Sequence, residues 1–218
     1  MLKNLIFNLL LGLIFLSMLL NFSGCTNPTG PLLNYLNLSP NESQMKDTFV
    51  SNLFPNDNTD SIPHLEAGTL FADSVIHRTY LQFDLNMIPN NAVISEAKVG
   101  LYFTEPISYV SIPIYIDVPI AVYRVDGYWN ESTLNWYNQP DVYYKYEDVQ
   151  LLGEETDDYV WWDITNLVQK WVSGTMPNYG ICLADQDEAT FDDIKKFYSS
   201  GHTNSSQWPR INISYYLP

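Results

Sequence analysis

The chain of 218 residues has little cysteine and little positive charge. Its two cysteines, Cys25 and Cys182, exclude a scaffold stapled by several disulfides. Ten Lys and Arg residues stand against 25 Asp and Glu residues, so the formal net charge at pH 7 is −15. Nucleic-acid recognition draws most of its affinity from Lys and Arg against phosphate, and no basic stripe occurs in this sequence. We therefore expect no nucleic-acid partner.

Catalytic motifs are also missing. The sequence contains no Gly-x-Ser-x-Gly, no His-Glu-x-x-His and no phosphate-binding loop. The three histidines, His64, His77 and His202, are scattered, and none stands beside a nucleophile suited to catalysis. Glycoside hydrolysis needs only two carboxylates at a suitable separation. The sequence does not exclude such a pair, but no feature of it favours this activity. The sequence therefore predicts a protein that is not an enzyme.

The first segment of the chain has the pattern of a targeting signal. Lys3 gives a positive start, residues 5–20 are mostly apolar, and Ser23-Gly24-Cys25 closes the segment with small residues before a cysteine. This is typical of a lipoprotein signal. The alternative is an uncleaved membrane anchor, for which the run is shorter than the roughly 20 apolar residues of a span. We expect a signal peptide at 1–24 and lipidation of Cys25.

Such lipidation would hold the mature protein at a membrane, outside the cytoplasm on the cell surface, because more than one acyl chain gives stable anchoring. Removal of the signal leaves nine basic and 25 acidic residues, a formal net charge of −16. Residues 25–45 are rich in Asn, Pro, Ser and Gly and predict a flexible tether. Residues 46–217 have the size of one ordinary domain. Cys182 lies in an apolar run of that domain, so we expect it in the core.

Alternation of apolar and polar residues predicts that this domain is built from β-strands. Residues 78–85 and 98–104 alternate as strands with one buried face do. Residues 163–174 differ, because their apolar positions follow helical spacing between a capping residue and Gly174. The pattern predicts an all-β fold, a jelly-roll-like antiparallel β-sandwich with one short helix. The expected strands are 48–53, 65–71, 78–85, 98–104, 114–125, 159–162, 180–184, 196–199 and 211–216.

Several blocks of the sequence resemble one protein family. The blocks are Arg78-Thr79-Tyr80-Leu81-Gln82-Phe83-Asp84-Leu85, Ile88-Pro89, Ala92-Val93-Ile94-Ser95-Glu96-Ala97, Val122-Tyr123-Arg124-Val125, Trp129-Asn130-Glu131-Ser132-Thr133-Leu134-Asn135-Trp136, Gln139-Pro140, Trp162-Asp163-Ile164-Thr165, Trp171, Phe197-Tyr198-Ser199-Ser200 and Pro209-Arg210-Ile211. In this order they resemble DNRLRE-type domains, which overlap the family 96 carbohydrate-binding modules. The letters that name the DNRLRE family do not occur in the chain.

The resemblance covers residues 47–216. It implies a jelly-roll-like sandwich of the kind found on secreted and surface-anchored bacterial proteins, often beside polysaccharide-degrading domains. It also implies glycan binding for some members, with alginate among the suggested ligands.

The tryptophans favour the core more than a binding surface. Trp129, Trp136 and Trp171 stand in the family blocks, and large aromatic side chains dominate burial, so we expect all three in the core. Trp161 and Trp162 are neighbours on a strand and must point to opposite faces, so one of them is expected to be partly exposed. The side chains expected to face inward are Phe83, Leu101, Trp136, Trp171 and Ile213.

Two groups of residues are candidates for a glycan-binding surface. The first occupies outward positions of the alternating strands and offers a cation, an amide and two phenols: Arg78, Tyr80, Gln82 and Tyr102. Such a mixture can hydrogen-bond sugar hydroxyls or pair with a uronate carboxylate; alternatively, Arg78 pairs with Asp84 or another acid. The second group lies in the loop region around Pro140, where it either binds a ligand or only covers the loop. Its members are Tyr137, Tyr143, Tyr144 and Tyr146.

Two acidic segments have structural or metal-binding interpretations. Asp185, Asp187 and Glu188 are oxygen ligands of the kind that suits calcium, which would be structural or bridging. Their spacing is not that of an EF-hand, and an acidic loop that is only solvated is the alternative. Asn130-Glu131-Ser132 is expected to be a capped turn rather than to carry a catalytic acid.

Together these observations predict a lipid-anchored, surface-displayed β-sandwich that binds polysaccharide. The alternative is a structural or adhesive envelope protein that binds another protein, because a fold does not fix a function.

Overall fold

The computed structural model describes residues 30, 32–38, 44–70, 74–104, 117–154, 157–188 and 192–218. Residues 32–218 cluster into one unit. The expected signal peptide at 1–24 and Cys25 lie outside the described residues. In the part of the chain that is described, no helix is long and apolar enough to span a membrane.

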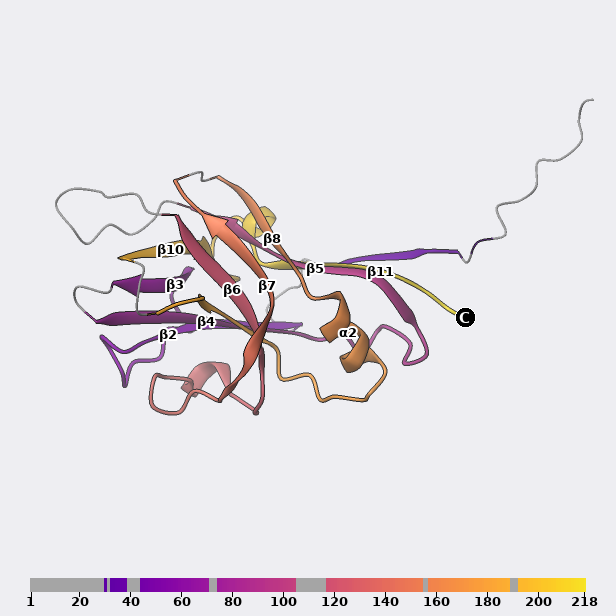
Figure 1. The fold of residues 1–218 in the computed structure, drawn as a ribbon, viewed down its shortest axis with the longest axis horizontal. Coiled ribbons are helices and arrows are strands. Elements are labelled where there is room, and N and C mark those ends of the chain that lie inside the picture. Colours follow the sequence, from indigo (N-terminus) through magenta and orange to yellow (C-terminus); the bar gives the residue numbers. More distant parts are fainter. Residues whose placement is uncertain are drawn as a thin grey trace, which may run out of the picture. The chain divides into compact units, whose positions relative to one another are not determined.

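Eleven strands and one α-helix make up the regular structure of these residues (Figure 1). The strands are β1 Asn34–Leu38, β2 Met45–Ser51, β3 His64–Leu70, β4 Val75–Phe83, β5 Val93–Phe103, β6 Val118–Val125, β7 Val142–Leu152, β8 Asp158–Asp163, β9 Ile181–Asp185, β10 Asp192–Tyr198 and β11 Arg210–Tyr216. The helix is α2 Thr165–Val172, and short 3-10 turns occur at η2 Glu131–Thr133 and η3 Ser205–Gln207. The predicted all-β fold with one short helix is confirmed.

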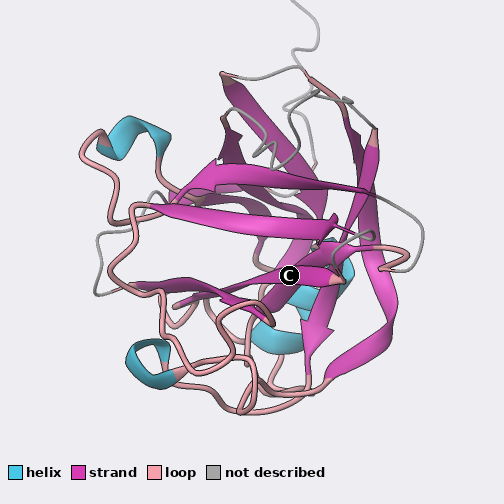
Figure 2. Ribbon diagram, turned by 90° about the vertical axis from the view of Figure 1, so that its left-hand side faces the viewer, coloured by secondary structure: helices cyan, strands magenta, loops and turns pink. Residues whose placement is uncertain are grey.

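All strand pairings are antiparallel, in the order β1-β11-β5-β10-β3-β4-β9-β6-β7, with β2 beside β4 and β8 beside β5. The strands curve around a common interior, as Figure 2 shows. Trp162 of β8 reaches across that interior, and its Nε1 donates a hydrogen bond to the carbonyl oxygen of Ile120 on β6 at 2.8 Å. Opposed antiparallel layers around one core form the predicted β-sandwich.

Inward side chains from both layers build one large apolar core. Phe83, Leu101 and Ile213 are buried there, as their alternation predicts. Trp162 is fully buried, whereas its neighbour Trp161 is half-buried on the other face of the strand, so the expectation for this pair is confirmed. Cys182 is also fully buried, in a second and smaller cluster.

The three family-block tryptophans do not share one environment. Trp129 is buried at 3% exposure, which confirms its expected core position. Trp136 and Trp171 are only half-buried, contrary to expectation, because each packs against the margin of an apolar cluster. Burial of these rings therefore does not follow the element that carries them, since the buried Trp129 lies in a loop and the half-buried Trp171 lies on the helix Thr165–Val172.

Helix α2 forms where the helical spacing predicts it. Its buried face is Leu167, Val168 and Val172. The N-cap residue, Ile164, forms no side-chain cap, but the preceding Asp163 side chain accepts a hydrogen bond from the backbone N of Thr165, the first helical residue, at 2.8 Å. Gly174, with φ of +71°, follows its end.

Two strands lie where the sequence predicts a tether or a loop. Strand β1 falls within 25–45, yet it pairs with β11 along its length, from Asn34↔Tyr215 to Leu38↔Ile211. Strand β7 takes up residues expected in the loop region around Pro140 and pairs with β6. Most side chains of both strands are exposed or half-buried, so neither produces a clear period-two signal.

Candidate functional site

The outward face of β4 is covered by another part of the chain. Residues 126–141, between β6 and β7, place Trp129 and Leu134 over this face in a second apolar cluster that also contains Tyr80 and Cys182. Tyr80 is 0% exposed, its ring lies 5.9 Å from that of Trp129, and burial raises the pKa of its hydroxyl. The prediction that Tyr80 presents a phenol to a ligand is therefore wrong, although it does point away from the main core.

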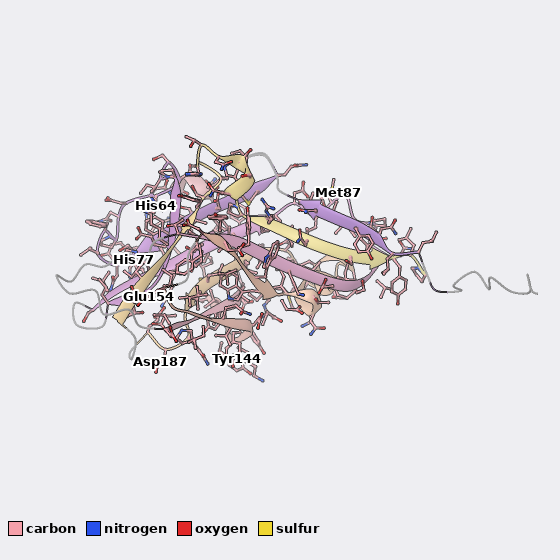
Figure 3. All side chains as sticks on the ribbon, turned by 90° about the horizontal axis from the view of Figure 1, so that it is seen from above. His64, His77, Met87, Tyr144, Glu154 and Asp187 are labelled. Atoms are coloured by element: carbon pink, nitrogen blue, oxygen red, sulfur yellow. The ribbon has the colours of Figure 1, made fainter. Side chains whose placement is uncertain are left out.

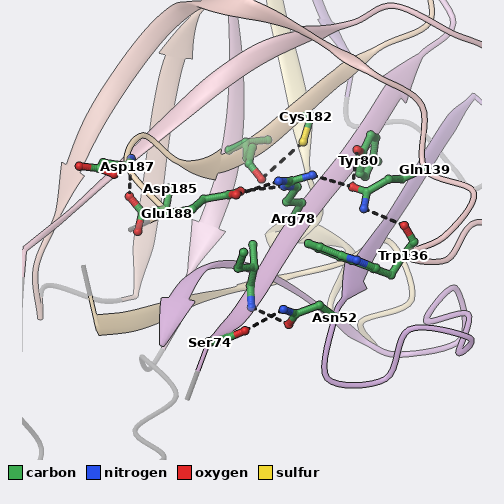
Figure 4. Close-up of polar contacts among 12 residues, drawn as sticks. Asn52, Ser74, Arg78, Tyr80, Trp136, Gln139, Cys182, Asp185, Asp187 and Glu188 are labelled. Carbon is green, nitrogen blue, oxygen red and sulfur yellow. Dashed lines mark hydrogen bonds and ion pairs between the residues drawn. The ribbon is translucent and has the colours of Figure 1, made fainter. Parts of the chain in front are cut away.

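Arg78 is engaged by a carboxylate within the protein (Figure 4). Its Nε and Nη2 donate to the two carboxylate oxygens of Glu188, both at 2.7 Å, and Nη1 donates to Gln139 at 3.1 Å. Burial opposes the guanidinium charge, but the bonds to Glu188 outweigh it and raise the pKa of Arg78. The guanidinium also lies 5.0 Å from the Trp136 ring centroid. This confirms the alternative in which Arg78 pairs with an acid, so Arg78 is not a free cation for a uronate.

Gln82 lies on the same face, at the border of a cavity of about 620 Å³. Its amide nitrogen donates to the Asn178 carbonyl at 2.7 Å, and its oxygen accepts a bond from Lys46 Nζ at 3.0 Å. The half-buried Trp171 lines the cavity from α2. Internal partners thus occupy both ends of the Gln82 amide.

Tyr102 lies on a different surface, the outward side of β5, β8, β10 and β11. Strand register places Tyr102 opposite Tyr159, and it places Gly100 opposite both Trp161 and Arg210. Because residues that pair across antiparallel strands share a face, these side chains gather on one side of the sheet. We call this surface the aromatic face; its members are Tyr102, Tyr159, Trp161, Tyr198, His202 and Arg210, and all six are half-buried.

The rings of the aromatic face form a connected series. Tyr159 lies 5.5 Å from Trp161 and 5.3 Å from Tyr102, measured between ring centroids. Tyr102 stacks on Tyr198 at 5.7 Å, and Tyr198 stacks on His202 at 3.7 Å. Hydrogen bonds to carbonyl oxygens hold the phenols in place, from Tyr102 to Asp157 at 2.7 Å and from Tyr159 to Trp208 at 2.8 Å. The series is therefore fixed before any ligand arrives.

A glycine and an arginine complete this surface. A Cβ atom on Gly100 would lie only 2.6 Å from the Trp161 ring, so the absence of a side chain lets the indole lie over the sheet. The Arg210 guanidinium carbon lies 4.0 Å from the Tyr159 ring centroid. Among the described residues, Arg210 forms no ion pair with a carboxylate, in contrast to Arg78. A groove of about 380 Å³, lined by Tyr159, Trp161 and the end of β7, adjoins the rings.

Aromatic rings beside a cation and a groove are suited to a sugar, because a flat ring covers the apolar face of a pyranose while polar groups bind its hydroxyls. The family model of carbohydrate-binding module family 96 matches residues 40–213. The chain belongs to this family. No curated protein matches it. The match confirms the resemblance to family 96 carbohydrate-binding modules and supports carbohydrate binding as the general function of this family 96 module.

The tyrosines around Pro140 in this family 96 module belong largely to a strand. Tyr143, Tyr144 and Tyr146 lie on β7, with Tyr144 74% exposed, and Tyr137 lies in the preceding loop. The Tyr143 and Tyr144 rings are 4.6 Å apart, and Arg124 lies over Tyr143. The expectation that they share one loop is therefore wrong, and they form a smaller aromatic group on the β6–β7 pair.

The predicted calcium ligands do not gather around one point. Asp185 is 3% exposed, and its Oδ1 accepts a bond from the backbone N of Asp187 at 3.0 Å. Both oxygens of Glu188 bind Arg78. In the described ranges, no set of three His, Cys, Asp or Glu side chains is arranged to hold a metal ion. The structure therefore does not support a calcium site at Asp185, Asp187 and Glu188.

Glu131 joins residues 126–141, which cover the outward face of β4, to strand β2 by a hydrogen bond. The predicted capped turn is confirmed, since the Asn130 side chain accepts a hydrogen bond from the backbone N of Ser132. The Glu131 Oε1 accepts a bond from the backbone N of Asp47 at 2.6 Å. Burial, together with the nearby charges of Asp60 and Asp47, raises the pKa of Glu131 to about 7. Burial likewise raises the pKa of Asp185 to about 6.

These two carboxyl groups predict a loss of stability as the pH rises. Their folded pKa values exceed the ordinary values of 4.5 and 3.8. Their stabilisation is therefore complete below those ordinary values and is lost as the pH passes through 6 to 7. Melting temperatures measured from pH 4.5 to 8 should fall, and the fall should be smaller in Glu131→Gln, which keeps the acceptor oxygen without the charge. An equal fall in Glu131→Gln and the unsubstituted protein would contradict this role of Glu131.

Proposed function

We propose that this family 96 module binds polysaccharide through its aromatic face and is displayed at the cell surface by lipid on Cys25. The observation that carries the binding proposal is the series of four aromatic rings from Trp161 to Tyr198, held by bonds within the protein. Tyr102 is one of the glycan-binding residues that the sequence predicts. Tyr159, Tyr198 and Arg210 come from three other strands and were not expected there.

The charge on the module favours certain glycans. The mature net charge of −16 repels a polyuronate at long range. Arg210 offers the local cation that Arg78 does not, because it lies beside Tyr159 without an acidic partner among the described residues. Affinity for a neutral glycan should then change little with salt, whereas affinity for a uronate polymer should change with salt, because salt screens both the long-range repulsion and the attraction to Arg210.

A glycan array probed with the purified protein, with and without calcium, tests the binding proposal. We expect discrete hits among polysaccharide fragments. Complete silence on neutral and acidic glycans would contradict it. If the protein bound no glycan but captured an envelope protein, this result would support the alternative of a structural or adhesive protein.

The anchoring proposal predicts the behaviour of Cys25→Ala. Without the thiol there is no site for the lipid, so the protein should leave the membrane fraction or fail to mature. Membrane fractionation and the mass of the N-terminal peptide check this result. Equal membrane retention of the two proteins, with no acyl mass on the unsubstituted one, would contradict lipidation. Cys182→Ser is not a suitable control because Cys182 is fully buried, so Ser205→Ala in an exposed turn serves instead.

A further inference from the structure

A cavity of about 570 Å³ lies at the end of β2. The segment between β2 and β3 lines it with Phe54 and residues 56–59. Ser51, His64, Glu66 and His77 line the same cavity, and Figure 3 shows the two histidines near one another. The sequence separates these side chains by up to 26 residues, so it gave no sign that they meet.

Within the cavity the four side chains form one hydrogen-bonded chain. Ser51 Oγ lies 2.9 Å from His77 Nε2, because Ser51 and His77 are directly opposed on β2 and β4. His77 Nδ1 lies 2.6 Å from Glu66 Oε2. The other oxygen of Glu66 lies 2.9 Å from His64 Nε2. Phe49 stacks on both imidazoles, at 6.0 Å from His64 and 5.7 Å from His77, and so holds the rings.

The carboxylate determines the direction of these hydrogen bonds. Burial opposes ionisation of Glu66, but the bonds to His64 and His77 outweigh it and lower its pKa to about 2. An ionised carboxylate only accepts hydrogen bonds, so His77 Nδ1 must carry a proton. In the neutral imidazole Nε2 is then an acceptor, and the Ser51 hydroxyl donates to it. Ser51 Oγ in turn accepts a bond from the backbone N of Leu53 at 3.1 Å.

We propose that Ser51, His77 and Glu66 form a nucleophile, base and acid triad that hydrolyses short-chain carboxylic esters in this cavity. The roles follow from the order of contacts, since a serine hydroxyl bonds the Nε2 of a histidine whose Nδ1 bonds a carboxylate. The cavity volume limits the substrate to a small molecule. Phe54 and Ile62 offer an apolar wall for a short acyl group. This activity goes beyond carbohydrate binding, and none of its three residues belongs to the aromatic face.

The proposed reaction has two steps. Ser51 Oγ attacks the ester carbonyl carbon and gives its proton to His77 Nε2, which returns that proton to the departing alcohol as its C–O bond breaks. Water then attacks the acyl-serine, gives a proton to His77, and releases the carboxylic acid as Ser51 recovers its proton. Asn56 lines the cavity, and its side-chain amide makes no hydrogen bond within the described residues. It is therefore available to donate to the carbonyl oxygen.

Labelling of the intact protein with a fluorophosphonate tests the nucleophile without any substitution. The reagent phosphonylates an activated serine, so peptide mass mapping should place a single adduct on Ser51. Prior heat denaturation should abolish the labelling, because the triad exists only in the folded chain. Absence of an adduct on Ser51 in the folded protein would overturn the proposal.

Hydrolysis of p-nitrophenyl acetate tests turnover. Ser51→Ala should lower kcat at least tenfold, to the rate of the free imidazole background, while exposed Ser205→Ala serves as the matched control and should leave it unchanged. Glu66 acts through His77, so Glu66→Gln should lower kcat at least tenfold with KM unchanged and should shift the midpoint of the pH–rate profile. Thermal melts confirm that each variant is folded. Equal rates for Ser51→Ala and the unsubstituted protein would show that the cluster is only structural.

Discussion

Replacing Trp162 by alanine is expected to lower the free energy of unfolding by about 3 to 5 kcal/mol, the cost of deleting a large buried aromatic side chain. Trp162 is fully buried in the main core, 6.0 Å from the Phe197 ring. Its Nε1 also satisfies the buried carbonyl of Ile120 across the sandwich. The substitution therefore leaves a cavity and removes the hydrogen bond to this carbonyl.

Chemical denaturation followed by fluorescence and circular dichroism measures this loss. Trp162→Phe is the matched variant, since it keeps a ring in the core and loses only the hydrogen bond and part of the volume. We expect its loss to be clearly smaller than that of Trp162→Ala. A loss below about 1 kcal/mol for Trp162→Ala, the scale of an ordinary substitution, would show that the two layers do not meet at this position.

Replacing the neighbouring Trp161 by alanine is expected to weaken polysaccharide binding by roughly 30-fold, or about 2 kcal/mol, the scale of an aromatic anchor in an interface. Trp161 leads the series of rings and borders the groove on the aromatic face. Its ring is half-buried and belongs to no core cluster, so the stability loss should be only about 1 kcal/mol. Titration calorimetry with a glycan identified on the array measures the affinity.

Two further variants sharpen this experiment. Gly100→Ala should also weaken binding, because the new Cβ displaces the Trp161 ring without removing it. Tyr128→Ala, at a tyrosine 71% exposed on the loop between β6 and β7, is the matched control and should bind normally. Normal binding by Trp161→Ala would contradict the aromatic face. If Tyr144→Ala then lost binding, the site would lie on β7 instead.

The different effects expected for the alanine substitutions of Trp161 and Trp162 follow from one local rule. Successive side chains of a strand point to opposite faces, so the sequence alone places one of these rings inward and the other outward. The same rule places Phe83, Leu101 and Ile213 in the core and Tyr102 on an outer face. Helix α2 is equally local, because its apolar spacing and the hydrogen bond from Thr165 to Asp163 lie within one segment. The order of the sequence blocks was enough to indicate the family.

Tertiary structure decided whether each outward face is free. Tyr80 and Tyr102 both point away from the main core, but residues 126–141 cover Tyr80 and leave Tyr102 half-exposed. It also decided which strands lie side by side, bringing Tyr159 to Tyr102 and Ser51 to His77. Side-chain direction repeats every two residues and can be read locally. Register and loop packing depend on contacts between segments far apart in the chain, so no local pattern of this sequence contains them.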